Sequence, residues 1–318
     1  ISDVLLLTSS PKYATLSIPK LHSEVKKMRE YLTGFLKEFE YSPEDAQQLL
    51  DAYDRITADD AAGRLLGEAL AAYEADIPTD YQTEILERAR RISELTGVHS
   101  FTADLLVFMC MTRHLRAVYA DRGLDMQIYR DSVLDLKWKL EECKAVKGIC
   151  GSFVAPWFCG FFDLSRFALG RLQFEIITTW QDYEKNGVRL EADKSRVINV
   201  HIPRTGTPLD KESCDKAYAQ AREFFKEQVG ESCPFVCFSW LLYPENKSIL
   251  PPHTNTYRFM SEYDIIGWED NDGEDLWRLF DTDEKDPYKL PVDTSMRRCY
   301  VEHLKKGGKV GNGFGVRL

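Results

Sequence analysis

Apolar and polar positions follow two different periods along the chain, and the change falls near residue 150. Before that point, apolar residues recur at three- and four-residue steps, as they do on one side of an α-helix. The predicted helices lie at 20–40, from Ser42 onward, and at 58–75, 80–96, 100–121 and 125–147. The links between them are short. We therefore expect a helical bundle as a first domain over residues 1–150.

Beyond residue 150 the pattern changes to short runs in which apolar and polar residues alternate, which is the period of β-strands. Three such runs, at 171–180, 197–202 and 235–242, are predicted strands. A helical segment at 211–229 separates the last two, and Asp210 is a suitable N-cap for it. Because strand, helix and strand in succession form a crossover, we expect these two strands to be parallel. Residues 151–318 then form a second, mixed α/β domain, and the fold class is α+β.

The segments after residue 260 give weaker predictions of structure. An acidic stretch covers 262–286, a helix is expected near 293–306, and glycines recur at Gly311, Gly313 and Gly315. No helix follows these glycines, so a phosphate-binding loop is implausible there. We interpret them as a flexible or strand-forming tail.

Composition narrows the classes of partner. The formal net charge is −10, with 44% hydrophobic and 29% charged residues, so the chain can form a core but offers no basic domain for nucleic acid. The richest apolar stretch, 101–111, contains Asp104 and is too short to span a membrane. The apolar run at 4–7 is too short for a secretory signal, and we interpret the eight cysteines as free thiols. These features predict a soluble, cytoplasmic protein without a membrane or nucleic-acid partner.

Candidate chemistry lies on the three strands, each of which has one apolar face and a polar pair on the other. The pairs are Gln173 with Glu175, Asn199 with His201, and Cys237 with Ser239. If the strands are neighbours in register, the six side chains converge on one wall, where a carboxylate, an imidazole and a thiol could perform proton transfer or nucleophilic attack. The alternative is a half-solvated sheet face, or polar groups satisfied beneath the helical domain.

A second candidate is the loop that leads from the second strand into the helix. It carries Arg204, Thr205, Gly206 and Thr207, and backbone N–H groups at a helix N-terminus beside glycine and arginine suit a phosphate. The alternative is a capped turn without a ligand. No metal site is predicted, because Cys233 and Cys237 would lie too far apart along a strand to share an ion.

Several segments together resemble the bacterial acyltransferase domain-containing proteins, in which a helical N-acyltransferase N-terminal domain precedes a GNAT-like C-terminal domain. They are LGRLQFE at 169–175, VHIP at 200–203, FSWLL at 238–242, LPP at 250–252, RF at 258–259 and HLKKGG at 303–308. The resemblance covers nearly the whole chain. It implies that strands 197–202 and 235–242 separate around an acyl-CoA and that the 204–210 loop holds its pyrophosphate.

The resemblance implies an N-acyltransferase that moves an acyl group from acetyl-CoA or another acyl-CoA to a small-molecule amine. Glu175 or His201 would deprotonate the amine, and backbone N–H groups of 237–241 would polarise the thioester. Ser239 or Cys237 would protonate the leaving thiolate. In addition to the loop residues, Trp240 is a predicted cofactor-binding residue.

Two alternatives remain open. The loop has one residue fewer between Arg204 and Gly206 than is usual in GNAT enzymes, and Pro208 has no N–H to donate. This departure motivates the first alternative, a catalytically inactive GNAT-like module that binds a small molecule or a protein. The second is a cysteine-dependent hydrolase or transferase with Cys237 as nucleophile and His201 as base. The sequence does not identify the acceptor, the acyl chain length or the oligomeric state.

Overall fold

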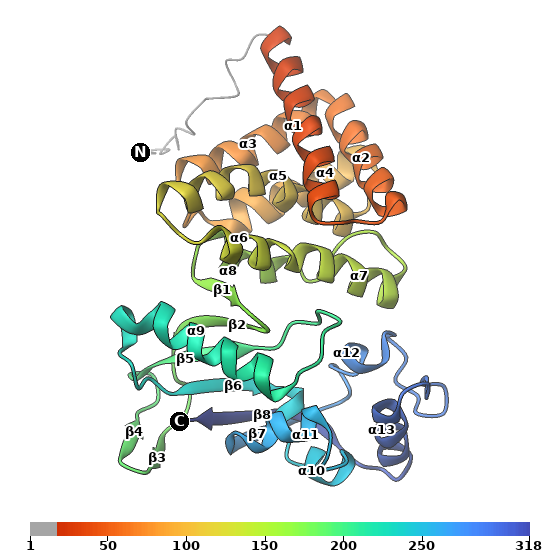
Figure 1. Cartoon of the computed structure of the whole chain (residues 1–318). Helices are drawn as coiled ribbons and strands as arrows, with labels where there is room; N and C mark the ends of the chain where they lie inside the picture. The colour runs from red at the N-terminus through yellow and green to blue at the C-terminus, as the bar shows by residue number, and fades with distance from the viewer. Residues whose placement is uncertain (1–17) are drawn as a thin grey trace, which may run out of the picture. The chain divides into compact units, whose positions relative to one another are not determined.

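A computed structural model describes residues 18–318, so the apolar run at 4–7 lies outside the described residues. The chain divides into two compact units (Figure 1). Within the described residues, one contains 18–122 together with 149–163, and the other contains 123–148 together with 164–318. The helix-rich first part and the mixed sheet that follows confirm the predicted α+β class.

The first unit is helical, as predicted. Its elements are α1 (Ile18–Glu38), α2 (Pro43–Ala58), α3 (Asp60–Ala75), the π-helical turn η1 (Tyr81–Leu86), α4 (Glu87–Thr96), α5 (Ser100–Asp121), the 3₁₀ turn η2 (Ala155–Phe158) and α8 (Cys159–Phe162). Helix α5 is buried along most of its length because nearly all its central residues are apolar. Its Phe108 ring lies 5.3 Å from Phe158 and 5.0 Å from Phe162, which places the core of this unit around α5.

The second unit begins with two helices, α6 (Met126–Val133) and α7 (Asp135–Lys147), where the sequence predicted one helix over 125–147. Asp125 caps the start, and Gly148, at a φ of +68°, ends the second helix. The buried Ser132 hydroxyl of α6 accepts a hydrogen bond of 3.0 Å from the Ala168 N–H. This bond fixes α6 against the first strand of the sheet.

A six-stranded sheet forms the centre of this unit. In spatial order its strands are β1 (Arg166–Leu169), β2 (Leu172–Thr178), β5 (Arg196–His201), β6 (Phe235–Ser239), β8 (Val310–Arg317) and β7 (Asp264–Asn271). A separate hairpin pairs β3 (Tyr183–Lys185) with β4 (Val188–Leu190). Strands β5 and β6 are parallel, which confirms the predicted crossover, and the other neighbouring pairs are antiparallel.

Helix α9 (Lys211–Val229) packs on one face of the sheet and matches the predicted helix in both bounds (Figure 1). Asp210 caps it, as predicted, by accepting a 2.9 Å hydrogen bond from the Ser213 N–H. The Tyr218 ring of α9 lies 6.1 Å from Phe174 of β2 and 4.9 Å from Phe235 of β6. The opposite face buries a separate cluster of apolar residues, composed of Tyr183, Leu190, Val197, Val236, Phe314 and Val316.

The last part of the unit departs from the prediction at the end of the 235–242 strand and forms a strand at the glycine-rich end, which is one of the two forms expected there. The expected strand 235–242 ends at Ser239, because the Ser239 hydroxyl accepts the Leu241 N–H at 3.2 Å and starts the 3₁₀ turn η3 (Trp240–Leu242). The glycine-rich end forms β8, inside the sheet. A side chain at Gly313 would collide with the Leu242 carbonyl, so the glycines there permit close packing.

Short helices complete the unit and surround a second apolar cluster. They are α10 (Asn246–Ile249), α11 (Asn255–Ser261), α12 (Trp277–Phe280) and α13 (Ser295–Lys305). Helix α13 corresponds to the helix expected near 293–306. Acids of the 262–286 stretch are held within the fold: Asp264 contacts Tyr183 and Lys185, and Asp270 accepts a 2.7 Å hydrogen bond from Tyr243.

The eight cysteines are thiols and not disulfides, as predicted, and six of them are buried. Within residues 18–318, no helix has an apolar stretch of the length needed to cross a membrane. In the same part of the chain, no group of three or more His, Cys, Asp or Glu side chains is placed to hold a metal ion.

Candidate active site

The parallel strands β5 and β6 stay paired over a short distance only. Within the described residues, Ile198 pairs with Phe235 and Asn199 with Val236. Beyond these positions β5 continues to His201 alongside β2, while β6 continues to Ser239 alongside β8. The two strands therefore separate after Asn199 and Val236, as the resemblance implied.

The register decides which predicted side chains share a face. Gln173 lies opposite His201, and Glu175 lies opposite Asn199, so these two pairs do converge on one face, as predicted. Asn199 is paired with Val236, so Val236 shares its face, and Cys237 points to the other side.

The prediction that all three pairs converge is therefore wrong for Cys237 and Ser239. Both lie on the face that α9 covers, because a one-residue difference in register moves every side chain of a strand to the opposite face. Cys237 is completely buried, and burial raises the pKa of its thiol well above the usual range. Cys237 and His201 thus do not form a nucleophile and base on one face.

Glu175 is the centre of a hydrogen-bonded network on the other face. Its Oε1 accepts from His201 Nε2 at 2.7 Å and from Asn199 Nδ2 at 3.0 Å. Its Oε2 accepts from Arg166 Nη2 at 2.9 Å and from Arg166 Nε at 3.2 Å. Both carboxylate oxygens are thereby used, and the side chains of Glu175 and Arg166 are 15% and 12% exposed.

The charges of this network follow from its burial and its partners. Burial raises the pKa of Glu175, but the hydrogen bond and charge of His201 and the charge of Arg166 outweigh it and bring this pKa down to about 2. Burial lowers the pKa of His201, and the bond to Glu175 does not restore it. At neutral pH, Glu175 is a carboxylate and His201 a neutral imidazole whose Nε2–H points at Glu175. Nδ1 is then the unprotonated nitrogen of the imidazole, which is the arrangement of a general base.

Sequence reasoning missed Arg166, although a signal was present. Gly170 and Arg171 form a two-residue turn between β1 and β2, with Gly170 at a φ of +64°. A hairpin around this turn places Arg166 opposite Glu175. Asp135 of α7 was also missed: it is buried, and its Oδ1 accepts a 2.8 Å hydrogen bond from Gln173. Burial raises its pKa, and its negative charge favours protonation of His201.

Polar contacts within the loop and with distant segments order the connection between β5 and α9. The guanidinium of Arg204 is bound to Asp281, which also accepts a 2.6 Å bond from Arg297. Thr205 and Thr207 bond to each other through their hydroxyls at 2.6 Å, and Gly206 has a φ of +72°. The predicted residues are thus brought together, with Arg204 held by a carboxylate.

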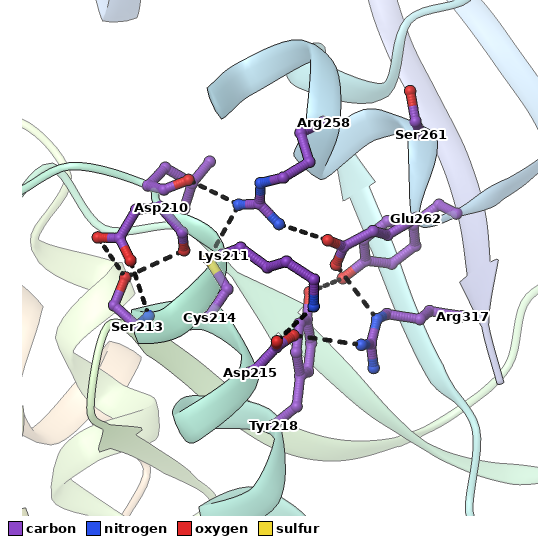
Figure 2. Close-up of polar contacts among 12 residues, drawn as sticks. Asp210, Lys211, Ser213, Cys214, Asp215, Tyr218, Arg258, Ser261, Glu262 and Arg317 are labelled. Carbon is purple, nitrogen blue, oxygen red and sulfur yellow. Dashed lines mark hydrogen bonds and ion pairs between the residues drawn. The ribbon is translucent and has the colours of Figure 1, made fainter. Parts of the chain in front are cut away.

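Two arginines that were not predicted hold the two ends of this loop. Arg171 donates to the carbonyls of Pro203 and Pro208, at 2.9 Å and 3.1 Å. Arg258 of α11 reaches the N-terminus of α9 and donates to the Leu209 carbonyl at 2.8 Å, while its other side binds Glu262 (Figure 2). Arginines from the β1–β2 turn and from α11 therefore position the start of α9.

Trp240 lies away from the position predicted for it on a strand. It belongs to η3, and its ring lies 6.0 Å from Tyr300 of α13 in an edge-to-face contact. Its carbonyl accepts a 2.7 Å hydrogen bond from Asn246. Because residues 240–242 form a 3₁₀ turn, the predicted row of strand N–H groups over 237–241 is wrong beyond Ser239.

Comparisons with known proteins agree with this geometry. Residues 30–164 match the model of the N-acyltransferase N-terminal domain, and residues 166–317 match that of the GNAT-like C-terminal domain. No curated protein sequence matches the chain.

Solved structures of acyltransferases share the fold. One, in complex with decanoyl-CoA and teicoplanin, is 20% identical, covers 93% of each chain and gives a TM-score of 0.70. Another, in complex with decanoyl-CoA, is 18% identical, with 95% of this chain and 99% of the other covered and a TM-score of 0.71. A third, in complex with CoA and 10C-teicoplanin, is 20% identical, covers 88% of this chain and 86% of the other, and gives a TM-score of 0.66.

Proposed function

The chain belongs to the family that joins an N-acyltransferase N-terminal domain to a GNAT-like C-terminal domain, and from this we propose that it is an acyl-CoA-dependent N-acyltransferase. The observation that carries the proposal is the early separation of β5 from β6, with the His201 and Glu175 pair on one side of the opening. The similar structures that contain acyl-CoA support the choice of donor.

The proposed reaction begins with the acceptor ammonium. Nδ1 of His201 removes one proton, and the carboxylate of Glu175, held by Arg166, stabilises the imidazolium that forms. The amine nitrogen then attacks the thioester carbonyl, and a C–N bond forms. As the tetrahedral intermediate collapses, the nitrogen releases a second proton to water and the C–S bond breaks, giving a neutral amide and a CoA thiolate. We assign protonation of this thiolate to the Ser239 hydroxyl, at the end of β6, which regains its proton from water.

The CoA phosphates would bind at the 204–210 loop. The N–H groups of Thr205, Gly206 and Thr207 supply donors, and Arg204 supplies the cation once it leaves Asp281. We also propose that Trp240, in the turn that follows β6, contacts CoA. The acceptor is a small-molecule amine, and teicoplanin, which is present in one of the similar structures, is a suitable member of a test panel.

Isothermal titration with acetyl-CoA, octanoyl-CoA and free CoA tests the donor. Binding by the wild-type chain, its loss in Arg204→Glu and its retention in Glu175→Gln would agree with the proposal. Lys216→Glu makes the same charge change on an exposed turn of α9, and its binding should equal that of the wild type. Failure to bind any of the three ligands would refute acyl-CoA dependence.

One alternative keeps the fold without the reaction. Arg204 is held by Asp281, and Pro208 offers no N–H, and both features favour a non-catalytic module that binds a small molecule or a protein. The alternative fails if the chain consumes octanoyl-CoA with any amine of a panel that includes teicoplanin, at a rate that His201→Ala reduces.

A further inference from the structure

Three aromatic side chains form a partly exposed cluster on the sheet face that carries His201. This aromatic platform consists of Trp180, which follows β2, Phe238 of β6 and Phe314 of β8. The Trp180 ring lies 6.3 Å from Phe238 in an edge-to-face contact and 5.5 Å from Phe314. Phe314 is buried, whereas Trp180 is 50% exposed and Phe238 is 42% exposed. Exposed rings of this size in contact with each other commonly mark a binding surface.

The platform borders the opening between β5 and β6. Asn199 and Val236 are the last paired residues, and His201 and Phe238 each lie two positions further along their strands. They are therefore on the same face, one on each side of the separation. A ligand whose nitrogen is bound at His201 and that spans the opening toward β6 meets Phe238 on this face.

The backbone that carries the platform is ordered by hydrogen bonds. Thr179, next to Trp180, is fully buried, and its N–H donates to the Ser195 carbonyl at 2.9 Å. Its hydroxyl donates to the Gln181 carbonyl at 3.2 Å. The backbone of Phe238 is paired with that of Phe314 in the sheet. A ligand that binds here therefore does not have to order this backbone.

The polar side of the same face has an unused acceptor. Asn199 is 3% exposed, and its Nδ2 donates to Glu175, yet among the described residues its Oδ1 has no hydrogen-bond partner. Turning the amide over would bring Oδ1 against the Glu175 carboxylate, so the present orientation is the favourable one. A buried acceptor without a partner is rare and points to a ligand donor.

We propose that this face is the acceptor subsite and that it selects amines borne on a planar aromatic ring. The ring packs on the platform. One N–H of the ammonium donates to Asn199 Oδ1, and another proton passes to His201. This inference rests on the proposed function, because it assigns to the acceptor the face on which His201 lies.

Saturation-transfer NMR with benzylamine and butylamine tests ring selection without requiring turnover. Stacking is worth about 0.5–1.5 kcal/mol, so we expect benzylamine to bind about three- to tenfold more tightly than butylamine. Phe238→Ala should abolish this difference. Trp268→Ala is the matched control, because Trp268 is 63% exposed but pairs with Gly313, the partner of Ser239, and so lies on the other face.

A second pair of probes tests Asn199. Benzylammonium has three N–H donors and N,N-dimethylbenzylammonium has one, so only the former can donate to Asn199 and His201 together. A hydrogen bond to a charged donor is worth about 1.5 kcal/mol or more. Asn199→Ala should therefore weaken benzylamine about tenfold and leave the dimethyl compound unchanged. Equal weakening of both probes would reduce Asn199 to a structural role and refute this part of the proposal.

The outcomes separate the two proposals. Equal binding of benzylamine and butylamine by the wild-type chain, or a ring preference that survives in Phe238→Ala, overturns the acceptor subsite. A change in preference between acetyl-CoA and octanoyl-CoA in Phe238→Ala would assign the platform to the acyl chain and also overturn it. If the wild type shows ring selection but binds no acyl-CoA, the proposed function fails, and with it the assignment of this face to an acceptor, while the binding of ring-bearing amines stands.

Discussion

Replacing Glu175 by glutamine removes the charge at the centre of the buried network and keeps the shape of the side chain. One oxygen of Glu175 accepts hydrogen bonds from His201 and Asn199, and the other accepts from Arg166. Glutamine has one carbonyl oxygen, so its NH₂ group must face either Arg166 or the other two donors. The variant loses one set of hydrogen bonds and places donor against donor.

The pH dependence of this loss follows from the pKa of Glu175, which is about 2 in the fold against an ordinary value of 4.5. A shift of this size corresponds to about 3 kcal/mol of stability. Because the pKa is lowered in the folded state, this contribution is fully present above about pH 5 and is lost as the pH falls toward 2. Glutamine does not titrate, so the variant lacks this contribution at every pH.

Urea unfolding of wild type and Glu175→Gln, followed by tryptophan fluorescence, measures the difference in free energy of unfolding. We expect this difference to shrink by about 2 kcal/mol between pH 7 and pH 3. The contributions of the other carboxylates cancel because both proteins carry them. Glu212→Gln is the control, since Glu212 is an exposed residue of α9, and its difference should not vary. If the free energy of unfolding differs between wild type and Glu175→Gln by the same amount at pH 7 and pH 3, the lowered pKa of Glu175 is refuted.

The other predictions concern the base, the helix cap and two buried positions. In a pH–rate profile, kcat/KM should fall on the acidic side at a pH below 6.5, because burial lowers the pKa of His201. Glu175→Gln should move this fall to a still lower pH, because the carboxylate that raises the pKa of His201 is gone. Asp210→Ala should lower the urea midpoint of unfolding, because the Ser213 N–H loses its acceptor, and Asp210→Asn should lower it much less. Cys237→Ala should retain acyl transfer, and a loss of transfer with the fold intact would favour the thiol mechanism. Gly313→Ala should lower the thermal midpoint, because its Cβ collides with the Leu242 carbonyl.

Local sequence signals predicted the elements that depend on neighbouring residues. Asp210 with the apolar stripe of 211–229 defined α9 in both bounds, because capping and periodicity act within one or two turns. The same kind of signal failed at Leu134, where α6 ends and α7 begins, and at Ser239, whose hydroxyl starts a 3₁₀ turn. Periodicity alone does not register such breaks, since the apolar pattern continues across them.

Contacts between distant segments were predictable where a turn fixes the register. The turn at Gly170 places Arg166 opposite Glu175, so this ion pair was accessible from the sequence. No such constraint acts between β5 and β6, which are joined through α9. Packing sets the register of these two strands, and the register decides which side chains of β6 share a face with Asn199 and His201. Both faces of β6 carry apolar residues, namely Val236 and Phe238 on one side and Phe235 on the other. The alternation of apolar and polar residues therefore did not determine which of the two faces of β6 lies beside His201.

The register of β5 and β6 decides which side chains lie beside His201 and therefore which reactions this face can support. With Cys237 on the His201 face, a thiol nucleophile with an adjacent base would have been plausible. In the observed register the same face offers Phe238, an imidazole bound to a carboxylate and an unpaired amide oxygen. These groups can bind and deprotonate an amine but cannot form a covalent intermediate through sulfur. A shift of one residue in one strand pair thus favours direct transfer between two bound substrates over transfer through the enzyme.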